Sequence, residues 1–296
     1  MYIIIIIILI IFIFIIYISI KYPGLFLPSC TDDDISGISH IVGEYDIFDD
    51  MYINEIIESV GIMEQEDCSN TINSVMDVVG YPTYIYPGNI TNDDIYDKNS
   101  LYYSERNKHN NILLDNVSFI YPIIINKLKY ITGKECEYPT YKKGVYKHTK
   151  HISDYIYSLP GFHIFKGGSW LGSGWDVASL HVDLQFNKLN FESNILHQFD
   201  MDDVFSFTIP IQMPDNSGLY IYDKTREDIS DALPLSYSMR NYKKYKINYD
   251  VGKMYIHDGL HYHMISSFVS DVDHDRITIQ GHGIYCKTTH SYWIYW

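Results

Sequence analysis

The second half of the chain is built from short alternating segments, and this pattern limits the possible folds more than any other feature. From Gly161 onward, apolar or alternating runs are separated by Gly, Pro, Asn and Asp residues, as in strands joined by turns. The segments expected to form strands are Phe162–Phe165, Ala178–Phe186, Val204–Ile211, Gly218–Tyr222, Lys253–His257, His261–Phe268 and Arg276–Tyr285. Short strands of this kind indicate a mainly β domain, either a sandwich, a barrel or a jelly roll.

The first half lacks this pattern and mixes helical segments with loops. Apolar residues recur at helical spacing in Ile53–Met63, and again in Asn111–Ile131, where Pro122 should kink or split the helix. We therefore expect an N-terminal α/β region of unknown role over residues 22–150, packed on a β domain over residues 151–296.

The N-terminus carries an apolar run that predicts a membrane anchor. Ile3 to Ile20 contains no charged residue, and as a helix it is just long enough to cross a bilayer core of about 30 Å. A cleaved signal peptide is the alternative, but no small-residue cleavage site is visible and Lys21 follows directly. We expect an uncleaved transmembrane helix over residues 1–21 in a single-pass membrane protein.

Two sequons favour a glycoprotein whose catalytic domain is lumenal or extracytoplasmic. They begin at Asn89 and Asn116. The four cysteines form no C-x-x-C pair, so a zinc ribbon is not expected, but their even number permits disulfides in an oxidising compartment.

The charge balance argues against nucleic acid as a partner. The 22 basic and 37 acidic side chains give a formal net charge of -15. Such a surface repels phosphate backbones, because binding to them depends on Lys and Arg side chains. We expect no nucleic-acid interaction.

His181-Val182-Asp183 is the first element with recognisable chemistry. Alternate side chains of a strand share a face, so the imidazole and the carboxylate point the same way. Two histidines and one carboxylate form the facial triad of non-haem iron(II) oxygenases, which leaves coordination positions open. H-x-D alone is common by chance, so the motif indicates a metal site only if the chain also supplies a third ligand.

A second element, Gly252–Ile265, holds three histidines that compete for that role, His257, His261 and His263. In a regular strand His261 and His263 share a face, whereas His257 precedes a turn. We favour His263, because Ile265 continues the inward face, and keep His261 as the alternative. The other two histidines would then support tyrosines and carboxylates near the metal.

The third element begins at Arg276 and continues to Gly283. Arg276 and Thr278 share a strand face. A buried arginine presents a rigid fork to a carboxylate, and a neighbouring hydroxyl adds a hydrogen bond. We expect this pair to bind a carboxylate.

Together, the H-x-D at His181, the distal His263 and the R-x-T at Arg276 resemble the 2-oxoglutarate- and Fe(II)-dependent dioxygenase superfamily. The gap between His263 and Arg276 is long for this family, which leaves open the choice between His261 and His263. The resemblance covers roughly residues 159–285. Further stretches that resemble the family are Leu159–Phe165, Phe205–Ile211 and Ser217–Leu219.

The resemblance implies a mainly β fold, a double-stranded β-helix (jelly roll) with flanking helices. It implies iron(II) on His181, Asp183 and His263, and 2-oxoglutarate as co-substrate, with its far carboxylate on Arg276 and Thr278. With molecular oxygen, such an enzyme hydroxylates a C–H bond. The substrate that we expect is a protein side chain, prolyl or lysyl, or a lipid.

Two alternatives remain. A cupin-type metal enzyme would use the same barrel and ligands without needing Arg276 or 2-oxoglutarate. The other alternative is a non-enzymatic, membrane-anchored binding domain, in which the order of these motifs would be a coincidence. The serine hydrolase, zincin and P-loop motifs are not found in the sequence.

Overall fold

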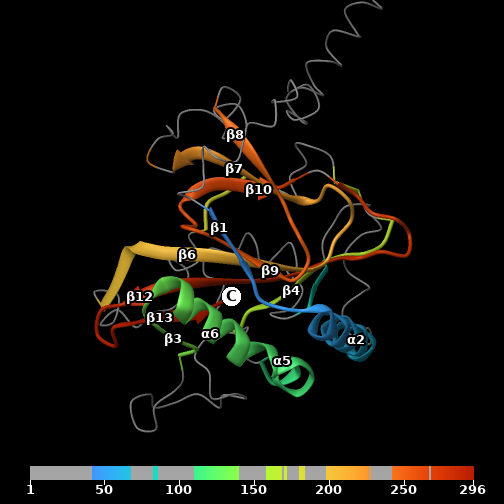
Figure 1. Ribbon diagram of the computed structural model, residues 1–296, viewed down its shortest axis with the longest axis horizontal. Helices are drawn as coiled ribbons and strands as arrows, with labels where there is room; N and C mark the ends of the chain where they lie inside the picture. The colour runs from blue at the N-terminus through green and yellow to red at the C-terminus, as the bar shows by residue number, and fades with distance from the viewer. Residues whose placement is uncertain are drawn as a thin grey trace, which may run out of the picture.

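The computed structural model describes residues 42–67, 83–85, 110–139, 158–168, 170–171, 180–183, 198–225, 227, 242–266 and 268–296. Within these ranges the chain is mainly β, with a large sheet, a small sheet and helices on one side (Figure 1). The prediction of a mainly β fold with flanking helices is confirmed, and the arrangement is consistent with a jelly roll.

The large sheet runs in the order β1-β9-β6-β12-β13-β3, with β4 pairing β12 and β2 pairing β4. Its strands are β1 (Val42–Asp46), β2 (Thr83–Ile85), β3 (Glu135–Glu137), β4 (Gly161–Phe165), β6 (Phe199–Gln212), β9 (Lys253–His257), β12 (Arg276–Cys286) and β13 (Ser291–Tyr295). Strands β1, β2 and β3 precede residue 150, so both halves of the chain contribute to one sheet. The domain boundary near residue 150 stays a prediction.

The small sheet runs in the order β10-β7-β8. Its strands are β7 (Gly218–Thr225), β8 (Lys244–Asn248) and β10 (His261–Ile265), and a separate pair is formed by β5 (Trp170–Leu171) and β11 (Phe268–Val269). His181 forms an isolated bridge with His263, on the edge of β10. Because β9 lies in the large sheet and β10 in the small one, the chain crosses between the sheets over residues 258–260.

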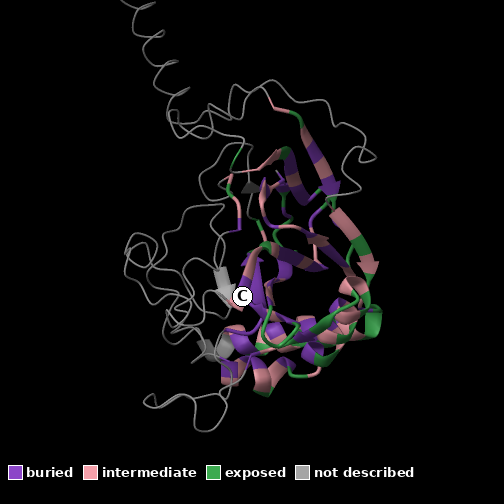
Figure 2. Ribbon diagram, turned by 90° about the vertical axis from the view of Figure 1, so that its left-hand side faces the viewer, coloured by how far each residue is buried: buried purple, intermediate pink, exposed green. Residues whose placement is uncertain are grey.

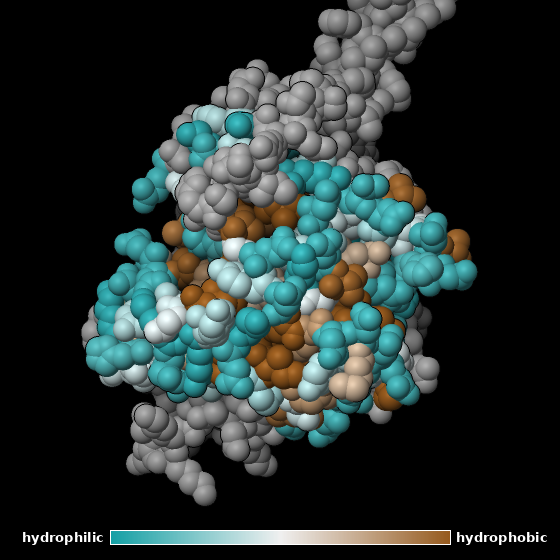
Figure 3. All heavy atoms as spheres, viewed as in Figure 1, coloured by the Kyte–Doolittle hydropathy of each residue, from teal (hydrophilic) through white to brown (hydrophobic). Residues whose placement is uncertain are grey.

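Three described helices, α2 (Asp50–Asp67), α5 (Asn110–Val117) and α6 (Ile120–Thr132), cover the outer face of the large sheet (Figures 1 and 2). Their buried side chains, among them Ile56, Leu113 and Ile124, share one core with Ile209 and Ile279 of the sheet. In the space-filling view, apolar residues show between hydrophilic ones around these helices (Figure 3). The helical cover therefore buries the apolar face of the large sheet.

Pro122 separates the second and third helices, as predicted. Helix α5 ends at Val117 and α6 begins at Ile120, which places Pro122 in the first turn of α6. The backbone N–H groups of a first turn have no partner within the helix, so the missing proline donor costs nothing there. Gly133 ends α6 with a left-handed φ of 65°.

Strand β12 divides its side chains sharply between the two faces of the sheet. Ile277 and Ile279 join the core beneath the helices. Arg276, by contrast, bonds to Ser217 beside the small sheet, so alternate residues starting at Arg276 face the space between the sheets. The inward face of this strand is therefore polar, and its outward face is apolar.

The strands predicted from alternation are found, with two exceptions in their extent. His261–Phe268 was predicted as one strand, but the chain divides there into β10 and β11, which pair with different partners. Most of the predicted strand Ala178–Phe186 lies outside the described residues. The predicted strands did not include β8, an edge strand of the small sheet, or β13, which lies between β12 and β3 in the large sheet.

The predicted single-pass membrane localisation is corrected. Among the residues that the structure describes, no helix combines the length and the apolar composition needed to cross a membrane. Helix α6 has 13 residues, and α2 carries acidic side chains such as Glu55 and Glu58. The apolar run at residues 3–20, on which the prediction depended, lies outside the described ranges.

The predicted glycoprotein is not supported either. Asn116 lies within α5, where its Nδ2 donates a hydrogen bond of 3.0 Å to the carbonyl oxygen of Ile112. Asn89 lies outside the described residues. Cys136 and Cys286 are both buried, free thiols.

The packing of α6 on the large sheet predicts a stability difference between two similar substitutions. Ile124 is 0% exposed in the core, whereas Ile62 on α2 is 45% exposed. Replacing Ile124 with Ala should lower the free energy of unfolding by about 2–5 kcal/mol, because it removes buried methyl groups and leaves a cavity. Urea denaturation measures this loss. Ile62→Ala is the control, and an equal loss in both variants would contradict the packing described here.

Candidate metal centre

A tight turn between β9 and β10 organises the region around the H-x-D motif. Gly259 has a φ of 72°, which favours glycine. A side chain there would lie 2.9 Å from Ser206 Oγ and 3.4 Å from Asp183 Cβ. The carboxylate of Asp258 accepts hydrogen bonds from the backbone N–H groups of Leu260 and His261, at 3.0 and 3.1 Å. The turn is thus held by its own aspartate and packs closely against Asp183.

The same turn positions Asp183 through the backbone. The N–H of Asp183 donates a hydrogen bond of 2.7 Å to the carbonyl oxygen of Gly259. The side chain of Asp183 is buried, with 7% of its surface exposed. Asp183 is therefore held by the segment that also leads into β10.

His181 and His263 form a reciprocal backbone pair. The N–H of His181 donates to the carbonyl oxygen of His263 at 3.1 Å, and the N–H of His263 donates back at 2.9 Å. Directly opposed residues of antiparallel strands project their side chains to the same side. The two imidazole rings accordingly lie with their centroids 4.5 Å apart.

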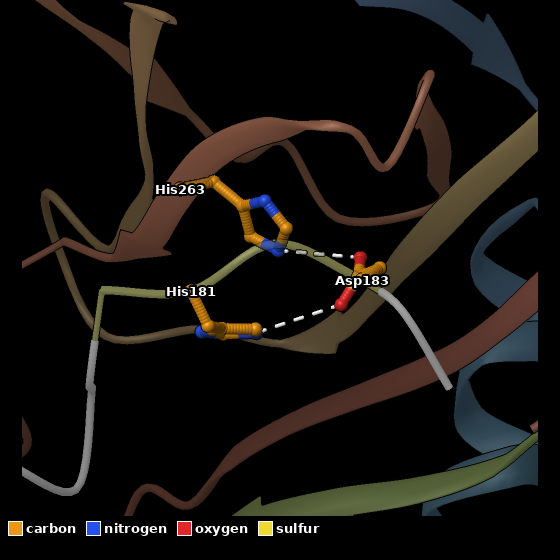
Figure 4. A group of neighbouring side chains, drawn as sticks. All are labelled: His181, Asp183 and His263. Carbon is orange, nitrogen blue, oxygen red and sulfur yellow. Dashed lines mark ion pairs between the residues drawn. The ribbon is translucent and has the colours of Figure 1, made fainter. Parts of the chain in front are cut away.

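The three side chains predicted as metal ligands converge. Figure 4 shows both histidine rings directed at the Asp183 carboxylate. His263 Nε2 lies 3.2 Å from Asp183 Oδ2, and His181 Nε2 lies 3.5 Å from Asp183 Oδ1. One ligand atom from each residue lies within 4.8 Å of the others, the spacing of a set that could hold one metal ion. His181 is 47% exposed, so the cluster is open on its side.

His261, the alternative ligand, points elsewhere. The register between β10 and β7 shifts between His261 and His263, with the extra residues in β7. His261 Nδ1 lies 2.6 Å from Asp258 Oδ2, within the turn. The geometry favours His263 over His261 as the third ligand.

His263 also has the tautomer that a metal ligand needs. Its Nδ1–H donates to the backbone carbonyl oxygen of His261 at 2.9 Å. Nε2, on the side of Asp183, is then the atom available to a metal ion. His261 thus contributes its carbonyl group rather than its side chain.

The electrostatics of the pair match a site for a cation. Burial alone would raise the pKa of Asp183, but His263 and His282 hold that pKa well below its usual range. Burial alone would lower the pKa of His263, but the Asp183 carboxylate raises it. The pair therefore attracts positive charge, which a divalent ion would supply in place of a proton.

Two further histidines lie near Asp183: His257, which the sequence suggested as a supporting residue, and His282, which was assigned no role from the sequence. His282 Nδ1 lies 3.9 Å from Asp183 Oδ2 and 2.8 Å from Ser206 Oγ. His257 packs against His263 with ring centroids 4.6 Å apart, and its Nδ1 accepts a hydrogen bond from the Gly259 N–H. Burial, followed by the charge of His263, lowers the pKa of His257 to about 3, so this ring is neutral. The alternation of polar residues along β12 is the signal that would have identified His282.

Arg276 and Thr278 lie at the start of β12, both buried, with 1% and 0% of their surface exposed. Arg276 Nε donates a hydrogen bond of 3.0 Å to Ser217 Oγ. The guanidinium lies 5.6 Å from the ring of Phe165 and 5.7 Å from that of Phe268. Aromatic rings thus shield a cation that a serine orients.

Comparisons with known proteins give structural similarity without sequence similarity. No protein-family model and no curated protein matches the sequence. Among solved structures, an N-substituted L-amino acid dioxygenase from Burkholderia ambifaria, in complex with alpha-KG, is 12% identical with a TM-score of 0.47. The match covers 88% of this chain and 91% of that one.

Two other solved structures are similar to this chain at comparable levels of sequence identity. SnoK, a non-heme alpha ketoglutarate dependent carbocyclase from nogalamycin biosynthesis, is 8% identical with a TM-score of 0.48, over 88% of this chain and 87% of that one. AviO1 from Streptomyces viridochromogenes is 10% identical with a TM-score of 0.39, over 85% and 96%. What this chain can do chemically follows from its own residues.

The positions of His261 and His263 predict different effects on metal binding. His263→Ala should weaken Co(II) binding by more than about a hundredfold, since loss of a hydrogen-bond partner to a ligand already costs about 10- to 100-fold. His261→Ala should keep the affinity within a few-fold, because the carbonyl group that holds His263 remains. Calorimetric titration of both variants with Co(II) measures this. The reverse order of effects would make His261 the ligand.

Proposed function

We propose that this protein is an Fe(II)- and 2-oxoglutarate-dependent oxygenase that hydroxylates a C–H bond. The observation that carries the proposal is the convergence of His181, Asp183 and His263 on one point, between two strands that the backbone holds together. Two imidazoles and one carboxylate on one side of an ion leave positions for a co-substrate and oxygen.

The donor set fits iron(II). Neutral imidazole nitrogen and carboxylate oxygen are ligands that Fe(II) accepts, although Zn, Ni and Co bind them too. Each donor is fixed before a metal arrives: His263 by its Nδ1–H bond, Asp183 by its backbone bond to Gly259, and His181 by its pairing with β10. A preorganised set of this kind binds with little loss of conformational entropy.

The surroundings of Arg276 fit the far carboxylate of 2-oxoglutarate. A guanidinium offers two parallel donors to a carboxylate, and this interaction is strongest where water is excluded. Phe165 and Phe268 supply that exclusion, and Ser217 orients the fork. A cupin-type enzyme that does not bind 2-oxoglutarate would not need a buried arginine here. The presence of Arg276 therefore favours the 2-oxoglutarate-dependent reaction.

Fe(II), once bound with 2-oxoglutarate and oxygen, supplies the oxidising chemistry. The chain's own residues orient the metal ion and the co-substrate and shield them from water. His181, Asp183 and His263 keep one side of the ion closed, Arg276 fixes the far end of the co-substrate, and His257 stays neutral beside the ligands. The half-exposed side of His181 is the open approach for a substrate.

The substrate within this proposal is a protein side chain, prolyl or lysyl, or a lipid, as expected from the sequence. Incubating the enzyme with candidate peptides and lipids, and following the gain of one oxygen atom by mass spectrometry, tests both classes directly.

Removal of Asp183 gives the first test of the activity. Protein supplied with Fe(II), 2-oxoglutarate and oxygen should form succinate, and Asp183→Ala should abolish this turnover because one of three ligands is lost. Asp215→Ala, on an exposed turn, is the control and should keep it. Full iron content and succinate formation in Asp183→Ala would refute the proposal.

Arg276 gives a second, independent test. Arg276→Ala should raise the 2-oxoglutarate concentration needed for half-maximal turnover roughly ten- to hundredfold, about 1.4 kcal/mol for each factor of ten. Arg276→Lys should need a 2-oxoglutarate concentration between those of the unaltered protein and Arg276→Ala. Lysine keeps the positive charge but lacks the two parallel donors of the guanidinium. Bound iron should stay the same in both variants. An unchanged 2-oxoglutarate requirement would assign the carboxylate to another residue.

A further inference from the structure

The inward face of β12 carries a polar row that leads from Arg276 to the candidate metal centre. Arg276, Thr278, Gln280 and His282 follow one another at every second residue. His282 at the far end lies 3.9 Å from the Asp183 carboxylate. Thr278 and Gln280 therefore lie between the arginine and the metal ligands along this strand.

His163 on β4 lies beside the middle of this row. Its Cα partner across the sheet is Thr278, and it is buried, with 5% of its surface exposed. Its ring centroid is 5.1 Å from that of Phe165, the ring that also packs on the Arg276 guanidinium. His163 is thus a buried imidazole at the arginine end of the space between Arg276 and the metal ligands.

Gln280 determines which nitrogen of His163 carries the proton. The amide nitrogen of Gln280 lies 3.1 Å from His163 Nδ1. An amide NH₂ group is only a donor, so Nδ1 accepts and the proton of the neutral ring is on Nε2. The ring therefore offers an N–H group on the side away from Gln280.

The ring is neutral as well as oriented. Burial lowers the pKa of His163 well below its usual range, and the positive charge of Arg276 lowers it further. A neutral donor next to a buried guanidinium adds a hydrogen bond without adding a second positive charge to desolvate.

We propose that His163 is a co-substrate-binding residue, whose Nε2–H donates a hydrogen bond to the distal carboxylate of 2-oxoglutarate beside Arg276, and that Gln280 positions it for this role. The inference rests on the proposed function. It assigns recognition of the distal carboxylate to two strands, with the charge from β12 and a neutral donor from β4. A 2-oxo acid without that carboxylate gains nothing from His163.

Anaerobic titration calorimetry on the Fe(II)-loaded full chain tests this assignment with two ligands. His163→Phe keeps an aromatic ring but removes the donor, and should weaken 2-oxoglutarate binding roughly ten- to hundredfold, as for a hydrogen bond to a charged group. Binding of 2-oxovalerate, which lacks the distal carboxylate, should be unchanged. His163→Gln keeps an N–H donor and should restore much of the 2-oxoglutarate affinity.

Gln280→Leu provides a second variant that leaves His163 in place. It should weaken 2-oxoglutarate binding a few-fold, because the ring is then free to move its proton to Nδ1. His274→Phe, at an exposed loop histidine, is the control and should bind both ligands as the unaltered protein does.

The outcomes separate this inference from the proposed function. If the unaltered, Fe(II)-loaded protein does not bind 2-oxoglutarate, both fail. If it binds, but His163→Phe and Gln280→Leu keep its affinity, the proposed function stands and the role of His163 is overturned. Equal losses for 2-oxoglutarate and 2-oxovalerate would also overturn it, since they indicate a general disturbance of the site.

Discussion

The reciprocal backbone hydrogen bonds between His181 and His263 are the constraint on which the candidate metal centre depends. They join a segment before the large sheet's β6 to a strand more than eighty residues later, and they place two imidazoles side by side. The turn at Gly259 adds the carboxylate, because its carbonyl group holds the backbone of Asp183. Backbone bonds position all three ligand candidates, so the geometry does not rely on flexible side chains finding one another.

The large sheet separates stability from chemistry by its two faces. Its outer face is apolar and is covered by helices, which provides the burial that stabilises the fold. Its inner face along β12 is polar, from Arg276 to His282, and faces the small sheet. Gly281 and Gly283 belong to the outer face, where the rings of Phe207 and Phe205 occupy the space of the missing side chains. Substitutions on one face should therefore affect stability, and those on the other should affect binding.

Local pattern predicted much of this arrangement. Period-two alternation located β4, β6, β9 and β12, and helical spacing with a proline located the helices α5 and α6. The same alternation put His181 with Asp183, and Arg276 with Thr278, on shared strand faces. Alternation could not decide between His261 and His263, because the contact of His261 with Asp258 and the pairing of His263 with His181 arise only in the folded chain. The small-sheet edge β8 was missed because its lysines resemble a solvated loop.

By itself, the sequence determined the mainly β character, the strand positions and the pairs of polar residues that share a face, because these depend on neighbours two residues apart. Only the tertiary structure decided which distant segments meet. It placed the side chain of His263, rather than that of His261, against the Asp183 carboxylate, and it placed His163 and Gln280 between Arg276 and His282. Such pairings depend on strand order and register, which arise from the packing of two sheets rather than from any local pattern.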